Sequence, residues 1–153
     1  MDKVNKFNVR VYGICVNENQ ELLVADERIN GVEMTKLPGG GLEFGEGPVE
    51  CVRREFIEEC GQEVEVLGHF YTTDFFVLSA FHTQSQIISI YYRVKLRSTP
   101  LFKTKNRKFD FNTKDSTSIA FRWVPLQELS PAEFTFPIDK RVAELLIDSM
   151  QTS

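Results

Sequence analysis

One stretch of the sequence, residues 39–61 (GGGLEFGEGPVECVRREFIEECG), constrains the fold more than any other. Pro48 suits the first position of a helix, Gly47 can serve as its N-cap, and Gly61 suits the position just past its end. At 100° per residue, one arc of this helix is apolar. The residues of that arc are Val49, Val52, Phe56 and Cys60. We therefore predict a helix over residues 48–60 that packs this arc against a hydrophobic core.

The rest of the chain predicts strands and a second helix. The segments with strand-like alternation or β-branched content are residues 7–16, 21–27, 63–78, 85–96 and 119–126. We expect the first two to form a hairpin, because only the short turn NENQ separates them. Residues 29–41 read as a loop with a short extended piece before Pro38. Residues 137–150 have the period of an amphipathic helix. Its predicted apolar stripe is Val142, Leu145, Leu146 and Met150. This order predicts an α/β (α+β) fold with a mixed sheet between helices.

The composition is that of an ordinary globular protein and excludes several classes. The chain has 153 residues, enough for one domain with a hydrophobic core, which we expect to span residues 1–153. A net charge of −4 argues against binding of a nucleic-acid polymer, which usually requires a basic surface. The sequence contains no run of 18 apolar residues that could cross a membrane. Residues 1–13 lack the apolar segment of a signal peptide. We therefore expect a cytoplasmic protein. Cys15, Cys51 and Cys60 form no CxxC pair, so we interpret them as buried thiols.

The predicted helix carries three carboxylates that repel one another. Glu55, Glu58 and Glu59 are spaced i, i+3 and i+4, which places them on one face. Like charges at these spacings destabilise a helix by about 0.2–0.5 kcal/mol per pair, and the helix dipole disfavours anions in the last turn. One interpretation is a solvated face in which Arg53, Arg54 and water dilute the repulsion. The other is a site for a divalent cation, because hard cations bind several carboxylate oxygens.

The preceding loop favours the second interpretation. Residues 37–47 (LPGGGLEFGEG) contain five glycines in eleven residues. Glycine allows the backbone to approach a ligand closely, and an ordinary strand-to-helix turn needs far fewer glycines. The loop lacks the G-K-[ST] ending of a P-loop and the G-x-G-x-x-G pattern of a dinucleotide site.

The same residues resemble the Nudix box, G-x5-E-x7-R-E-U-x-E-E-x-G-U, in which U is a bulky apolar residue. Gly40, Glu46 and residues 54–61 match this pattern in register. The one departure is Gln62, where the family prefers an apolar residue. The chain therefore resembles the Nudix (MutT-like) hydrolases, strongly over these 23 residues and more loosely over residues 122–129 and the C-terminal helix.

The resemblance implies roles for individual residues. The metal ligands that it implies are Glu55, Glu58, Glu59 and the backbone carbonyl of Gly39. Arg54 resembles the family arginine that orients the glutamates by ion pairing and completes the implied catalytic set. Gly40 and Glu46 would support the loop. Glu55 is one candidate for the general base, and a carboxylate from a later loop is the other.

The resemblance also implies a fold and a reaction. The fold would be the Nudix fold, a mixed β-sheet in an α/β/α sandwich. The reaction would be hydrolysis of a nucleoside diphosphate linked to another moiety, with Mg²⁺ or Mn²⁺ as the cofactor and a small nucleotide-type diphosphate as the substrate. The alternative is a non-catalytic nucleotide-sensing module, although such modules commonly lose box glutamates that are all present here. The identity of the substrate, the residues that bind it and the presence of a homodimer stay open.

Residues outside the box supply weaker candidates. Asp115 ranks ahead of Asp74 and Asp110 as a further site carboxylate, because it precedes the last strand. Residues 102–118 form a long loop whose cations could grip phosphates, although a solvated loop is the default. These cations are Lys103, Lys105, Arg107, Lys108 and Lys114. Candidates for stacking on a base are Phe75, Phe76, Tyr91 and Tyr92. His82 could be a base or a phosphate contact, but we interpret it as a loop residue. Cys51 could be a thiolate ligand, but we interpret it, like His69, as structural.

Overall fold

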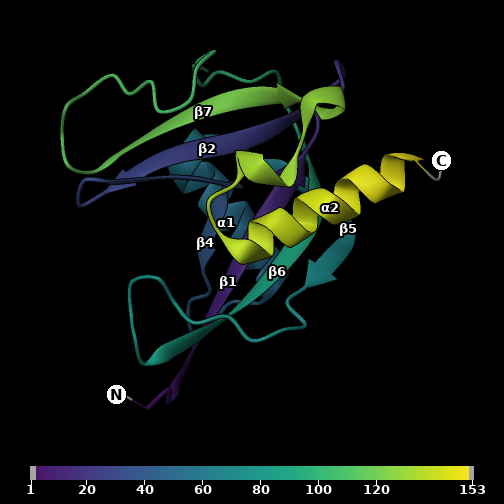
Figure 1. The fold of residues 1–153 in the computed structure, drawn as a ribbon. Helices are drawn as coiled ribbons and strands as arrows, with labels where there is room; N and C mark the ends of the chain where they lie inside the picture. The colour runs from purple at the N-terminus through teal and green to yellow at the C-terminus, as the bar shows by residue number, and fades with distance from the viewer. Residues whose placement is uncertain (1–2, 152–153) are drawn as a thin grey trace.

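Two β-sheets form the middle of the molecule, with one helix on each side (Figure 1). The computed structural model describes residues 3–151. The strands are β1 (Lys6–Cys15), β2 (Glu21–Ile29), β3 (Val32–Lys36), β4 (Gly39–Gly41), β5 (Val64–Thr72), β6 (Ser85–Leu96) and β7 (Ser118–Pro125). The helices are α1 (Pro48–Cys60) and α2 (Pro137–Gln151), with 3₁₀ turns at Leu126–Glu128 and Pro131–Glu133. The predicted α/β/α arrangement is confirmed.

The larger sheet is mixed and has the strand order β4-β1-β6-β5. Strand β1 lies parallel to β6 and antiparallel to β4, and β5 lies antiparallel to β6. The smaller sheet is antiparallel, with the order β3-β2-β7. The extended piece expected before Pro38 is therefore a full strand, β3, and the glycines that follow it form β4.

The predicted hairpin between the first two strands is wrong. A single bridge joins Val16 to Leu22 beside the turn, after which the strands diverge into different sheets. Each strand finds longer partners elsewhere: β1 pairs along its whole length with β6, and β2 pairs with β7. The divergence matters for function because it opens a space between the two sheets. Residues 63–78, in which one or two strands were expected, hold one strand, β5, which ends at Thr72, and a single bridge from Leu78 to Gln86.

Helix α1 follows its local signals. It begins at Pro48, and Gly61 ends it in the left-handed conformation with φ of 68°. The backbone N–H of Gly47 donates a hydrogen bond to the carboxylate of Glu50, which closes the first turn. The core-facing side chains of α1 are Cys51, Val52, Phe56 and Cys60. The predicted apolar arc is thus buried except for Val49, which is half-buried, and Cys51 is an additional core residue.

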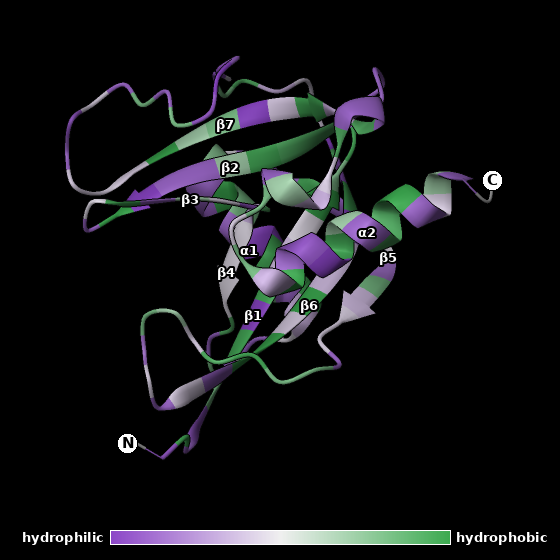
Figure 2. Ribbon diagram, viewed as in Figure 1, coloured by the Kyte–Doolittle hydropathy of each residue, from purple (hydrophilic) through white to green (hydrophobic). Residues whose placement is uncertain are grey.

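Helix α2 covers the opposite side of the sheets, and its ribbon in Figure 2 alternates between green apolar and purple polar residues. Val142 and Leu146 are fully buried there, as the helical period predicts. Met150 is exposed instead, because the helix has passed the end of the core by that turn. Among residues 3–151, no helix is both long and apolar enough to cross a membrane.

A buried ion network ties the long loop before β7 to the smaller sheet. Asp26 is fully buried and accepts hydrogen bonds from Arg122, from the Thr35 hydroxyl at 2.8 Å and from the backbone N–H of Phe109 at 3.1 Å. Arg122 also donates to Glu133 at 2.7 Å. One carboxylate thereby joins β2, β3, β7 and the loop.

Replacing Asp26 should therefore destabilise the fold strongly. In Asp26→Asn the side chain keeps its shape but leaves the Arg122 guanidinium without its buried counter-ion. We expect the free energy of unfolding to fall by about 3–5 kcal/mol. The measurement is urea denaturation followed by circular dichroism. Glu33→Gln is the matched control, because it breaks a partly exposed pair with Arg28, and its effect should stay below about 1 kcal/mol. Equal losses of unfolding free energy in both variants would show that the buried network stabilises the fold no more than a partly exposed ion pair does.

Candidate active site

The glycine loop brings the backbone of β4 against α1. A Cβ atom on Gly40 would lie 2.6 Å from the carboxylate carbon of Glu55, so any larger residue would displace that side chain. Gly39 has φ of 149°, and a Cβ there would lie 2.2 Å from the carbonyl oxygen of Val11. Glycine at position 40 therefore leaves the Glu55 carboxylate in its place, and at position 39 it is required by the close backbone of β1.

Arg54 holds the acidic groups of this region together. Its guanidinium donates to both carboxylate oxygens of Glu46, at 3.0 and 2.7 Å, and to the carbonyl oxygen of Gly41 at 3.0 Å. Its Nη1 also donates to Glu55 at 3.0 Å and to Glu58 at 3.1 Å. The hydrogen bonds from Arg54 lower the pKa of Glu46 to about 2. One cation thus offsets the mutual repulsion of three carboxylates.

Glu59 lies apart from this cluster and faces Lys36. Its carboxylate accepts a hydrogen bond from the backbone N–H of Gly39 at 3.4 Å and lies 4.0 Å from the ammonium of Lys36. Burial raises the pKa of Glu59 to about 7, although Lys36 opposes the rise. Lys36 also contacts Glu27 at 3.3 Å and the carbonyl oxygen of Gly39 at 3.4 Å. The carboxylates of the site are therefore divided between two cations, with Glu46, Glu55 and Glu58 on Arg54 and Glu59 on Lys36.

The oxygen atoms gathered here suit a hard divalent cation by their chemistry. Carboxylates and a backbone carbonyl are the ligands that Mg²⁺ and Mn²⁺ prefer. The contact between Gly40 and Glu55 places one such carboxylate directly against the loop. Within residues 3–151, however, no three His, Cys, Asp or Glu side chains are arranged to enclose an ion. The glutamates of α1 instead face cations of the protein itself. Arg54 donates hydrogen bonds to Glu55 and Glu58, and Lys36 lies beside Glu59.

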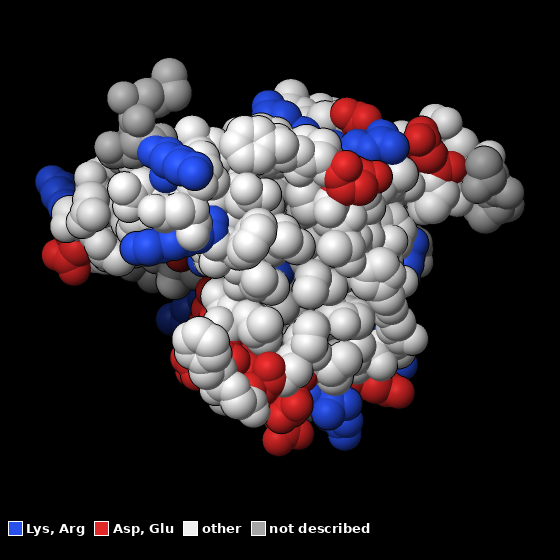
Figure 3. Space-filling view, turned by 90° about the horizontal axis from the view of Figure 1, so that it is seen from below, with Lys and Arg blue, Asp and Glu red and all other residues white. Residues whose placement is uncertain are grey.

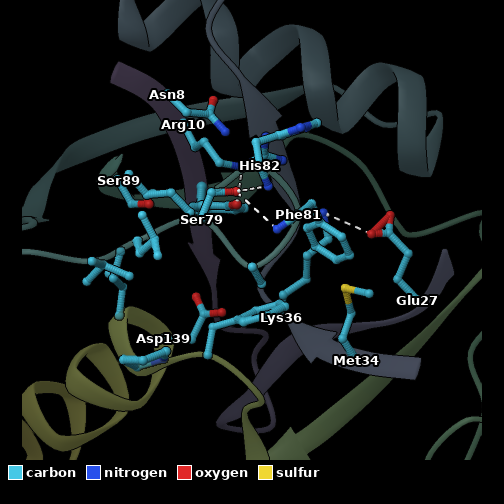
Figure 4. A pocket seen from close by; sticks show the side chains of 18 of the residues that line it. Asn8, Arg10, Glu27, Met34, Lys36, Ser79, Phe81, His82, Ser89 and Asp139 are labelled. Atoms are coloured by element: carbon cyan, nitrogen blue, oxygen red, sulfur yellow. Dashed lines mark hydrogen bonds and ion pairs between the residues drawn. The ribbon is translucent and has the colours of Figure 1, made fainter. Parts of the chain in front are cut away.

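A cavity of about 510 Å³ opens between the two sheets (Figure 4). Its walls are Arg10 and Tyr12 of β1, Met34 and Lys36 of β3, side chains of β2 and β6, residues 77–82 and the start of α2. Lys36 connects this pocket to the acidic helix, because it lines the pocket and contacts Glu59. Figure 3 views the molecule from below and shows acidic side chains gathered along the lower edge of that face.

The wall of the pocket includes a buried carboxyl group, Asp139. It accepts a hydrogen bond from the hydroxyl of Tyr91 at 2.6 Å, and Tyr91 stacks on Tyr12 with 5.3 Å between ring centroids. Burial raises the pKa of Asp139 to about 6, while the hydrogen bond from Tyr91 and the charges of Lys36 and Arg10 lower it. In Figure 4 the carboxyl group points into the pocket from α2, opposite Asn8 and Arg10. It offers a ligand a hydrogen-bond acceptor in an otherwise largely apolar space.

The structure brings the predicted box residues together and adds three that the sequence did not indicate. Arg54, Glu46 and Glu55 make direct contacts. Arg10, Lys36 and Asp139 were missed, because each belongs to a different element and none forms part of a local pattern. The one local signal was a charged residue at an inward position of an otherwise apolar strand.

The other candidates have mixed outcomes. Cys51 is buried, as interpreted, with its sulfur 3.5 Å from the carbonyl oxygen of Gly41. His82 lines the pocket, so its loop is closer to the site than expected. Asp115 lies beside the β2–β3 turn, where its carbonyl oxygen accepts a hydrogen bond from Arg28. Lys105 and Lys108 of the basic loop contact Asn112 and Glu133. Tyr91 belongs to the core, whereas Phe75 and Phe76 are exposed.

Comparison with known proteins agrees with this geometry. A family model described as the NUDIX domain matches residues 6–146. A NUDIX hydrolase from Nitrosomonas europaea has a similar structure, with a TM-score of 0.70 and 20% identity over 94% of this chain and 90% of that one. The ORF135 protein of E. coli gives a TM-score of 0.71 and 17% identity over 96% and 93% of the two chains. A MutT NUDIX hydrolase from Burkholderia pseudomallei gives 0.68 and 17% over 92% and 98%. At these identities the structural likeness establishes the fold alone.

The buried carboxyl of the pocket should lower stability at neutral pH. The ordinary pKa of Asp139 is 3.8 and its pKa in the fold is about 6. Between these values the folded chain holds a proton that the unfolded chain has released, so stability falls as the pH rises through this window. Asp139→Asn should therefore unfold with about 1–3 kcal/mol more free energy than the wild type at pH 7.

This gain should shrink steadily as the pH falls from 6 to 4, because the unfolded wild-type chain then begins to bind the same proton. Urea denaturation at a series of pH values from 4 to 8 measures it. The control is Asp148→Asn on the exposed side of α2, which should show no such pH-dependent gain. A variant at residue 139 that is less stable than the wild type at pH 7 would contradict the assignment.

Proposed function

The chain belongs to the NUDIX family of hydrolases, and from that premise we propose that it hydrolyses a nucleoside diphosphate linked to another moiety, with Mg²⁺ or Mn²⁺ as the cofactor. The bond that breaks is a phosphoric anhydride, and the attacking group is water. A nucleoside triphosphate and a nucleotide sugar both belong to this class of substrate. A structurally similar protein is described as a UDP-X diphosphatase, with a TM-score of 0.63 and 20% identity.

One observation carries the proposal: a cluster of helix carboxylates lies beside a pocket large enough for a nucleoside. Lys36 lines the pocket and contacts both Glu59 and the carbonyl oxygen of Gly39. A substrate whose organic part lies in the pocket would therefore have its phosphates next to α1. An acidic helix repels phosphates unless a cation lies between them, which agrees with metal-dependent chemistry.

The residues of the box have separate tasks in this proposal. The ligands that would hold the metal are Glu55, Glu58, Glu59 and the carbonyl oxygen of Gly39. Arg54 orients Glu55 and Glu58, because it donates to both through one nitrogen. Glu46 holds Arg54 in place from the loop. The cation, when bound, would acidify a water molecule and offset the charge that develops at phosphorus.

The pocket would supply binding and orientation. Its apolar wall, which includes Met34 and Phe81, can pack against the faces of a ring. Asp139 provides an acceptor for a donor group of that ring. Glu55 is the proposed general base, since it lies against Gly40 and is held by Arg54. Binding and chemistry are thereby divided between the space that separates the sheets and the helix beside it.

Turnover of a substrate panel tests the proposal directly. The panel contains nucleoside triphosphates, 8-oxo-dGTP, nucleotide sugars, ADP-ribose and dinucleotides, each with Mg²⁺, with Mn²⁺ and with EDTA. We expect hydrolysis of at least one compound that stops in EDTA. Glu58→Gln should lower the rate by at least about 100-fold, since it removes a carboxylate from the proposed metal site.

The matched control is Glu144→Gln, because Glu144 is also an exposed helix glutamate paired with an arginine, but on α2. It should keep the wild-type rate. Turnover that persists in EDTA, or that survives in Glu58→Gln, would contradict the proposed mechanism. No turnover at all, with a nucleotide that still raises the melting temperature, would instead support a nucleotide-sensing module.

A further inference from the structure

Arg10 lies where the pocket meets the acidic helix. It lines the pocket from β1 and pairs with Gly41 of β4. Its Nη1 lies beside Gly41, because a Cβ built on that glycine would be 3.7 Å from Nη1, an ordinary contact distance. The carbonyl oxygen of the same glycine accepts a hydrogen bond from Arg54. The guanidinium of Arg10 is thus beside the glycine loop and open to the pocket.

One edge of the Arg10 guanidinium donates a hydrogen bond, and the other edge donates none to residues 3–151. Its Nε donates a hydrogen bond to the hydroxyl of Tyr12 at 2.6 Å, and Tyr12 is itself fixed by stacking on Tyr91. Of the described residues, only Tyr12 accepts a hydrogen bond from this side chain. The Nη groups are therefore available as donors on a guanidinium whose position is already determined.

Lys36, the other cation of the pocket, is in a different situation. Its ammonium contacts the carboxylates of Glu27 and Glu59 and the carbonyl oxygen of Gly39. The structure records no ion pair for Arg10 among residues 3–151. Glu55 and Glu27 are nevertheless near enough to act on it: burial lowers the pKa of Arg10, but Tyr12 and these two carboxylates raise it above its ordinary value. Arg10 is therefore a charged donor that forms no ion pair with any carboxylate of residues 3–151.

We propose that Arg10 binds the phosphate group that is bonded directly to the nucleoside of the substrate, which is the organic part placed in the pocket. The planar fork of a guanidinium matches two oxygens of a phosphate. The position at the junction selects this phosphate, because the organic part would fill the pocket on one side and the remaining phosphate would lie towards α1 on the other. The inference rests on the proposed function only in taking the pocket as the site of the organic part. Arg10 lies outside the box and takes no part in holding the metal.

Binding measured without metal tests the role apart from catalysis. The probes are the 5′-monophosphates of adenosine, guanosine, cytidine and uridine, each compared with its nucleoside by calorimetric titration in EDTA. We expect at least one monophosphate to bind the wild type about 10- to 100-fold more tightly than its nucleoside. Arg10→Met should reduce this ratio to near one. Arg10→Lys should keep part of it, since it preserves the charge and loses the fork.

Arg93→Met is the matched control. Arg93 lies on the same sheet, in β6, with its guanidinium 4.8 Å from the ring centre of Phe70 and away from the pocket. This variant should keep the wild-type ratio. If the Arg10 variants do not fold, NMR of the wild type decides: the Nε–H resonance of Arg10 should move with a monophosphate and not with its nucleoside.

The outcomes separate this inference from the proposed function. A phosphate preference that persists in Arg10→Met, or that is missing from the wild type, would overturn the role of Arg10 even if metal-dependent hydrolysis is observed. An Arg10-dependent preference in a protein that hydrolyses nothing would support the role of Arg10 and contradict the proposed reaction.

Discussion

The hydrogen bonds of Arg54 are the interaction on which the rest of the site depends. Three glutamates accept hydrogen bonds from this one guanidinium, and two of them belong to the same face of α1. Without it, the carboxylates would repel one another in the last turns of a helix whose dipole also disfavours them. Arg54 further binds the carbonyl oxygen of Gly41, so the same side chain fixes the loop against the helix. Arg54 thus offsets the repulsion within the carboxylate cluster, and the fold can tolerate these charges.

In our account, the separation of the two sheets forms the pocket that holds the substrate beside this carboxylate cluster. Strands β1 and β2 meet at one bridge and then take different partners, and the pocket lies in the space that results. The pocket carries charges of both signs. Asp139, Arg10 and Lys36 line it, and Lys36 also contacts Glu59 of α1 outside it. In our account this arrangement matches a substrate with a hydrogen-bonding ring in the pocket and phosphates towards α1.

The sequence predicted the parts of the site that depend on neighbouring residues. Pro48 and Gly61 bound α1 correctly because helix ends follow local rules, and the spacing of Glu55, Glu58 and Glu59 fixes which face they share. The pairing of β1 with β6 could not be predicted, since these strands are more than seventy residues apart and many registers satisfy their alternation. The pocket was missed for the same reason. Arg10, Lys36 and Asp139 belong to β1, β3 and α2, so only the tertiary fold brings them to one pocket.

The account makes one central claim: the glutamates of α1 are kept because a divalent cation uses them. The most direct measurement is the free energy of unfolding with and without Mg²⁺ or Mn²⁺, for the wild type and for Glu59→Gln. The account predicts that the metal stabilises the wild type, by about 2.7 kcal/mol at one hundred times the dissociation constant, and that Glu59→Gln largely loses this gain. In EDTA the same variant should be at least as stable as the wild type, because it removes one repelling charge. A wild-type protein whose stability is unchanged by either metal would contradict the claim.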